Sequence, residues 1–189
     1  MSGRPADREA LIALLRERSF ERKKVTLASG RESDFFIDCK QAVLTGEGHV
    51  LVGRLMLAAL EDLPRCDAVA GVELGGCPLA SAVSLTSGLG GRALPALYVR
   101  KEVKDHGSRR LVEGDRALVP GMPVVILEDV VTTGGSTLKA VDKLRQAGAK
   151  VVGVVALVDR LEGGAETIRA AGLPLVAICT RRDFIPDGS

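Results

Sequence analysis

The stretch "VVILEDVVTTGGST", Val124–Thr137, decides the fold class of this chain. An apolar run leads directly into two carboxylates, Glu128 and Asp129, and a loop of threonines, glycines and a serine follows. A short apolar run bounded by such residues is typical of a buried strand, and residues 136–146 have the apolar spacing of an amphipathic helix. The stretch therefore predicts strand, glycine-rich loop and helix in that order, which is one unit of an α/β fold.

The loop "TTGGS", Thr132–Ser136, is predicted to bind a phosphate. Backbone N–H groups and the helix dipole favour an anion at the start of a helix, and glycines let the backbone approach it closely. The spacing fits neither a Walker loop nor a dinucleotide fold. Because the adjacent carboxylates suit hydroxyl groups, loop and acids together predict a 5-phosphorylated ribose. The alternative, a capped helix start beside solvent-exposed acids, explains a bare Thr-Gly-Gly-Ser but not the whole string.

Length and charge place few limits on the partners of the chain. A length of 189 residues and 46% hydrophobic residues predict one globular domain over residues 1–189. With 26 basic and 24 acidic side chains the net charge is only +2. We therefore expect neither nucleic acid nor a membrane surface as a partner.

Cysteines and histidines are too few and too scattered for a zinc site. The chain has four cysteines with no Cys-x-x-Cys pair and two histidines. The first residues are charged and amphipathic, and no apolar run approaches the ~20 residues of a membrane span. We expect a reduced, cytoplasmic protein whose cysteines lie in the core.

Strands and helices are predicted to alternate through most of the chain. Two helices, around residues 11–15 and 51–60, flank a hairpin that turns at Ser29-Gly30. Alternation beyond them predicts an α/β fold with a doubly wound, mainly parallel sheet flanked by helices, and ligands at the carboxyl ends of its strands. We expect strands at 67–73, 95–101, 123–129, 150–159 and 174–180, and helices at 78–87, 136–146 and 164–171.

"VVILEDVVTTGGST" resembles the phosphoribosyl-pyrophosphate signature of the type I phosphoribosyltransferases. Three further segments resemble the orotate phosphoribosyltransferases of that family: the hood "VTLASGRESDFFID", the mobile loop "YVRKEVKDHGSRRLVEG" and the strand end "VDR". The resemblance implies a small N-terminal hood, formed by about residues 1–45 and the C-terminal residues. It also implies transfer of phosphoribosyl from its pyrophosphate to orotate in UMP biosynthesis. A purine phosphoribosyltransferase and a nucleic-acid-binding regulator that senses phosphoribosyl pyrophosphate are the alternatives.

The resemblance implies roles for individual residues. Catalysis would rest on Lys104, His106 and Asp129. Phosphoribosyl pyrophosphate would bind to Arg100, Lys101, Lys104, His106, Glu128, Asp129, Val130, Val131, Thr132, Thr133, Gly134, Gly135 and Ser136. Orotate would bind to Phe35, Phe36, Thr132 and Arg160. Adjacent strand residues point to opposite faces, so at most one of the two phenylalanines should lie against the orotate ring.

The segment "RKEVKDHGSRR", residues 100–110, is independently suited to a polyanion. It holds five Lys and Arg side chains against two acids, and it follows a strand of the sheet that carries the phosphate loop. A solvated loop is the alternative. The resemblance implies magnesium, held mainly by substrate oxygens with no direct protein ligand, and a homodimer in which this loop reaches the neighbouring site.

Two positions depart from the family pattern. Ala28 and Gly75 stand where many relatives carry a basic residue. Either Arg31 or the pair Arg109-Arg110 replaces these contacts, or phosphoribosyl pyrophosphate binds more weakly.

Overall fold

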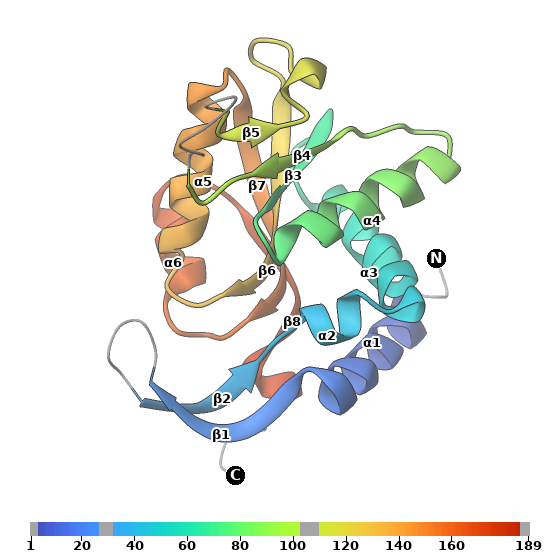
Figure 1. Cartoon of the computed structure of the whole chain (residues 1–189), viewed down its shortest axis with the longest axis vertical. Helices are drawn as coiled ribbons and strands as arrows, with labels where there is room; N and C mark the ends of the chain where they lie inside the picture. Colours follow the sequence, from blue (N-terminus) through green and yellow to red (C-terminus); the bar gives the residue numbers. More distant parts are fainter. Residues whose placement is uncertain (1–3, 27–31, 103–109, 186–189) are drawn as a thin grey trace.

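A six-stranded sheet forms the centre of this computed structural model, which describes residues 4–26, 32–102 and 110–185 (Figure 1). Its strands are β3 (Ala68–Val72), β4 (Ala96–Val99), β5 (Val112–Glu113), β6 (Pro123–Val131), β7 (Lys150–Asp159) and β8 (Leu175–Thr180). They lie in the order β5-β4-β3-β6-β7-β8, and every neighbouring pair is parallel except β4 and β5. This confirms the doubly wound, mainly parallel sheet predicted from the alternation of elements.

Helices cover both faces of the sheet, and each face has its own hydrophobic core (Figure 1). The helices are α3 (Gly46–Ala59) and α4 (Gly76–Leu89) on one face, and α5 (Gly135–Gln146) and α6 (Gly164–Ala170) on the other. Burial on both sides explains why β3 and β6 consist almost wholly of apolar residues up to Glu128.

The N-terminal elements pack together with the C-terminal segment. They are α1 (Arg4–Arg18), β1 (Phe20–Thr26), β2 (Glu32–Ile37) and α2 (Lys40–Val43), with the short 3-10 helix at Arg181–Asp183. The rings of Phe20, Phe35 and Phe184 meet with centroids 5.2 to 5.7 Å apart. Arg181 donates to Asp34 across 2.6 Å. These contacts hold the β1–β2 hairpin against the end of the chain, below the sheet in Figure 1.

The predicted elements agree with the structure apart from local differences. The strand expected at 123–129 extends to Val131, and the helix expected at 78–87 runs from Gly76 to Leu89. The strand expected at 95–101 ends at Val99, and β5 and α2 have no counterpart in the expectations. Elements of two and four residues are too short to give a periodic signal. The turn expected at Ser29-Gly30 lies outside the described residues. None of the helices in the described ranges combines the length and hydrophobicity that a membrane span requires.

Candidate functional site

The site lies where the connections from β3 and β6 diverge. The chain passes from β3 through α4 to β4 on one side, and from β6 through α5 to β7 on the other. In an open parallel sheet such a reversal leaves a crevice at the carboxyl ends of the two strands. The loops after β3 and β6 both open into this crevice, so they are expected to share a ligand.

The loop after β6 has the geometry of an anion site. Gly134 adopts φ 82° at the N-cap of α5, and its carbonyl accepts from Leu138 N–H at 3.0 Å. A Cβ at Gly134 would also meet Gly164 O at 3.0 Å, so glycine is required there on two counts. Thr133, Gly135 and Ser136 are exposed. The first turn of α5 is therefore open to a phosphate.

The acid pair in β6, which is followed by Val130 and Val131 before the strand ends, divides into a buried and a more accessible carboxyl. Glu128 is only 5% exposed and accepts a hydrogen bond from Thr137 Oγ1 at 3.0 Å. Burial, together with the nearby charge of Asp129, raises the pKa of Glu128 to about 8. Asp129 is half-buried, which raises its pKa, while the N–H of Val130 bonds its Oδ1 at 2.9 Å. Asp129 is thus the better placed of the two to accept from a ribose hydroxyl.

Gly75, in the loop between β3 and α4, packs directly against Asp129. A Cβ built on Gly75 would lie 1.8 Å from Asp129 Oδ2. No side chain fits at position 75 while Asp129 keeps its place, so the basic contact missing here cannot be restored at this position alone. Of the other positions that bear on this contact, Ala28, Arg31 and Arg109 lie outside the described residues, whereas Arg110 is exposed and donates to Asp115 Oδ1 at 3.0 Å.

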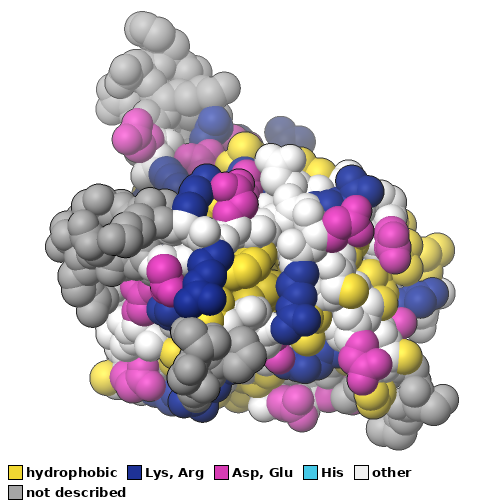
Figure 2. Space-filling model, turned by 90° about the horizontal axis from the view of Figure 1, so that it is seen from below, with side chains coloured by type: hydrophobic (Ala, Val, Ile, Leu, Met, Phe, Trp, Pro, Cys, Tyr) yellow, Lys and Arg dark blue, Asp and Glu magenta, His cyan; other side chains and the backbone are white. Residues whose placement is uncertain are grey.

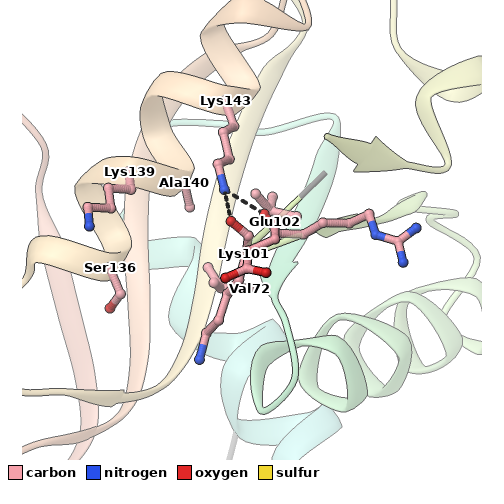
Figure 3. Close-up of a pocket in the computed structure, with 9 residues that line it drawn as sticks. Val72, Lys101, Glu102, Ser136, Lys139, Ala140 and Lys143 are labelled. Carbon is pink, nitrogen blue, oxygen red and sulfur yellow. Dashed lines mark hydrogen bonds between the residues drawn. The ribbon is translucent and has the colours of Figure 1, made fainter. Parts of the chain in front are cut away.

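The basic segment after β4 begins beside this crevice. Arg100 donates to Glu113 Oε1 of β5 at 2.7 Å, and Lys101 is exposed and near enough to lower the pKa of Asp129. Lys104 and His106 lie outside the described residues. A pocket of about 320 Å³ lies between this segment and α5 and is drawn in Figure 3. It is lined by Val72, Val99, Arg100, Lys101, Glu102, Ser136, Lys139, Ala140 and Lys143.

The residues expected to contact orotate are partly brought together. Arg160, at the end of β7, is 8% exposed and donates to Phe35 O at 3.0 Å, which joins the hairpin to the sheet. The side chain of Phe35 is fully buried among other rings, whereas Phe36 is half-buried with Lys23 Nζ 4.0 Å from its ring centroid. Only one of the two phenylalanine rings is thus open to a ligand, as expected for adjacent strand residues, and the orotate contact itself stays a prediction. The ring that packs inward is that of Phe35. Its inward direction on β2 leaves no side-chain surface for a ligand, and Phe36 is the remaining candidate.

Val130 and Val131 contribute to the site with their backbone groups, not with their side chains. Val131 is 1% exposed, and its carbonyl accepts from Arg160 N–H at 3.0 Å. Thr132, the next residue, is half-buried at the entrance of the loop.

Lys40 is a site residue that the sequence analysis missed. Its ammonium bonds Asp38 Oδ1 at 2.5 Å, and among cations it has the largest lowering effect on the pKa of Asp129. Cys39, its neighbour, is buried with Sγ 3.9 Å from Asp129 O. The signal was present as "IDCK" directly after the hood strand. Only the folded chain, in which Cys39 and Lys40 lie next to Asp129, shows that this segment belongs to the site.

Basic and acidic side chains both lie on the side of the molecule seen in Figure 2. Figure 2, seen from below Figure 1, shows Lys and Arg side chains on both sides of a hydrophobic patch. Within the described ranges no three His, Cys, Asp or Glu side chains form a metal-binding group. The site thus offers cations and N–H donors to an anionic ligand.

Comparison with known proteins gives close matches over almost the whole chain. Residues 51–170 match the model of the phosphoribosyl transferase domain. An orotate phosphoribosyltransferase of Sorangium cellulosum (strain So ce56) is 85% identical over 182 residues, which cover 96% of this chain and 95% of that protein.

Solved structures agree with these matches. Orotate phosphoribosyltransferase of Mycobacterium tuberculosis H37Rv, in complex with Fe(III) dicitrate, superposes with a TM-score of 0.81 at 40% identity, covering 95% of this chain and 99% of that one. The same enzyme in complex with 5-phospho-alpha-D-ribosyl 1-diphosphate gives 0.77 at 38% identity, covering 94% and 98%.

Proposed function

This chain belongs to the phosphoribosyltransferase family, among its orotate phosphoribosyltransferases, and we infer that it transfers the 5-phosphoribosyl group of phosphoribosyl pyrophosphate to orotate. The products are orotidine 5′-monophosphate and pyrophosphate, in the de novo synthesis of UMP. The observation that carries this function is the 85% identity over 96% of the chain. The phosphate loop and acid pair at the divergence of β3 and β6 agree with it.

The substrate is proposed to lie across the crevice. Its 5-phosphate binds the N–H groups of Thr132–Ser136 at the start of α5, and Asp129, with Glu128 behind it, faces the ribose hydroxyls. The backbone of Val130 and Val131 lines the path between them. The pyrophosphate then points toward Arg100 and Lys101, and Lys104 and His106 of the partner subunit are proposed to reach it from the neighbouring loop.

Orotate is proposed to bind between the hairpin and the ends of β6 and β7. Phe36 offers its half-buried ring, and Thr132 offers its hydroxyl at the start of the phosphate loop. Arg160 supplies a cation at the end of β7 and holds the backbone of Phe35. A buried guanidinium can pair with a carboxylate group such as that of orotate in a fixed geometry.

The reaction is proposed to proceed by attack of the orotate ring nitrogen on the anomeric carbon, with inversion and departure of pyrophosphate. The ribosyl group becomes cationic and the leaving group gains negative charge in the transition state. Lysine and arginine side chains near the pyrophosphate stabilise that charge, and Asp129 holds the ribose in place. His106 is proposed to donate a hydrogen bond to the pyrophosphate.

Magnesium is proposed to enter with the substrate. Asp129 already accepts from Val130 N–H and Glu128 from Thr137, so neither carboxylate offers both of its oxygens freely. This fits an ion held mainly by pyrophosphate and ribose oxygens. When bound, the ion would neutralise charge on the leaving group.

A homodimer in which residues 103–109 serve the neighbouring site is also proposed. Leu85 and Leu89, one turn apart on α4, are 60% and 83% exposed, and Leu74 beside the crevice is 69% exposed. Exposed leucines one turn apart on a helix, such as Leu85 and Leu89, favour a protein contact. Nucleic acid and membrane are not proposed as partners.

The chain is proposed to work as one cytoplasmic domain over residues 1–189. Its four cysteines are free thiols, and all of them are buried. The hood is proposed to comprise about residues 1–45 and the C-terminal residues, in agreement with the contacts of Phe20, Asp34 and Asp183.

Incubation of the purified chain with orotate, phosphoribosyl pyrophosphate and magnesium tests the function. We expect orotate consumption together with stoichiometric pyrophosphate and orotidine monophosphate. Adenine, hypoxanthine and uracil in place of orotate are expected to give no product. Turnover of a purine with no turnover of orotate would contradict the proposed substrate.

A further inference from the structure

Residues Arg100–Glu102 follow the end of β4 and belong to no regular strand. Three other parts of the chain nevertheless form hydrogen bonds with their backbone. Arg100 N–H donates to Leu111 O at 2.9 Å, and Lys101 N–H donates to the carboxylate of Glu73, in the loop after β3. The third contact comes from α5. Lys143 Nζ donates to the carbonyl oxygens of Arg100 at 2.7 Å and Lys101 at 2.6 Å (Figure 3).

Lys143 is well suited to this contact. Two consecutive carbonyls pointing the same way need two donors close together, and an ammonium carries three donors on one atom. The side chain is half-buried, so its methylene stem packs against α5 while its head reaches the carbonyls. In Figure 3 Lys139 of the same helix points away from the segment, so Lys143 is the lysine of α5 that makes this contact.

The contact joins two parts of the site that are far apart in sequence. α5 begins at the phosphate loop, and Arg100–Glu102 begins the basic segment proposed to meet the pyrophosphate. Because α5 is rigid, its lysine fixes the start of that segment relative to the loop that holds the 5-phosphate. The carboxylate of Glu73 accepts a hydrogen bond from Lys101 N–H of the same segment.

We propose that Lys143 is a positioning residue for catalysis, which holds the backbone of Arg100 and Lys101 and so directs these two residues toward the pyrophosphate of the substrate. The inference rests on the proposed function, since the segment has a pyrophosphate to meet only if that substrate binds. Lys143 itself is not proposed to touch the substrate.

Three variants test the proposal. Lys143→Met removes the donors and keeps the apolar stem, and Lys143→Arg keeps donors at the same position. Arg145→Met is the matched control, because it removes a positive charge from the same last turn of α5 but lies exposed beside Asp142. Amide hydrogen exchange of the peptide that covers residues 98–102 is measured first, followed by steady-state kinetics with each substrate varied.

Lys143→Met is expected to speed exchange of Lys101 N–H and to lower kcat/KM for phosphoribosyl pyrophosphate by about 10-fold. This is less than the roughly 100-fold cost of a full misplacement within a site, because the contacts of the segment with Leu111 and Glu73 remain. KM for orotate and the thermal midpoint should match those of Arg145→Met. Lys143→Arg should lose no more than about threefold, because it retains hydrogen-bond donors.

Unchanged exchange in Lys143→Met, or equal kinetic losses in Lys143→Met and Arg145→Met, would overturn the proposal. A wild-type chain without orotate turnover would instead overturn the proposed function. The exchange measurement still decides in that case whether Lys143 holds the segment.

Discussion

Replacing Gly75 by alanine should disable the site without unfolding the protein. The new Cβ would lie 1.8 Å from Asp129 Oδ2 and 2.2 Å from Asp129 Cγ, far inside van der Waals contact. The atoms it meets belong to the end of a side chain, so the carboxylate can rotate away. That rotation breaks the 2.9 Å bond from Val130 N–H and removes the acceptor proposed for the ribose hydroxyl.

We expect Gly75→Ala to lower kcat/KM for phosphoribosyl pyrophosphate by about 100-fold, about 2.7 kcal/mol of transition-state stabilisation, as for other small displacements within a site. The free energy of unfolding should change by less than about 1.5 kcal/mol, because no core side chain is displaced. Gly88→Ala is the matched control, since a Cβ at Gly88 on α4 meets nothing within 4 Å. Orotate consumption and urea unfolding measure the two effects.

A double-mutant cycle decides the cause. If Gly75→Ala acts by displacing the carboxylate, it should cost little further activity in an Asp129→Asn background, because the group it displaces has already been altered. Full activity in Gly75→Ala would refute the reasoning, and so would losses that simply multiply in the double variant.

Three further predictions follow from the site. Glu128, with its pKa raised to about 8 from 4.5, contributes stability that is fully present below about pH 4.5 and lost as the pH rises through 8. Between about pH 4.5 and 8 the free energy of unfolding of the wild type should therefore fall, relative to that of Glu128→Gln, by up to about 1.4 kcal/mol per pH unit. The same pH dependence of urea unfolding in the two proteins would contradict this. Lys40→Met should raise the pKa of Asp129 and shift the acid limb of kcat/KM to higher pH, whereas an unmoved limb would exclude this coupling. Arg160→Lys should raise KM for orotate about 10-fold, because lysine lacks the planar fork, with KM for phosphoribosyl pyrophosphate as the unaffected comparison.

The signature of the site was readable from the sequence because its parts are consecutive. Strand β6, the acids at its end, the glycine loop and the start of α5 occupy residues 123–136 without interruption. Local preferences therefore determine their shape: an apolar run forms the strand, and Gly134 supplies the positive φ at the helix start. The alternation of strands and helices likewise predicted the parallel sheet, since the connection between two parallel strands needs a crossover.

Tertiary structure decided what depends on residues far apart in the chain. Only the packing of the hairpin against Phe184 turns Phe35 inward and leaves Phe36 accessible. The close approach of Gly75 to Asp129 joins the loop after β3 to strand β6, more than 50 residues further on, and the bonds from Lys143 to Arg100 and Lys101 span a separation of 42 to 43 residues. No local pattern encodes such distances. They arise because the sheet brings the carboxyl ends of β3, β4 and β6 to one edge, where side chains from separate segments compete for the same space.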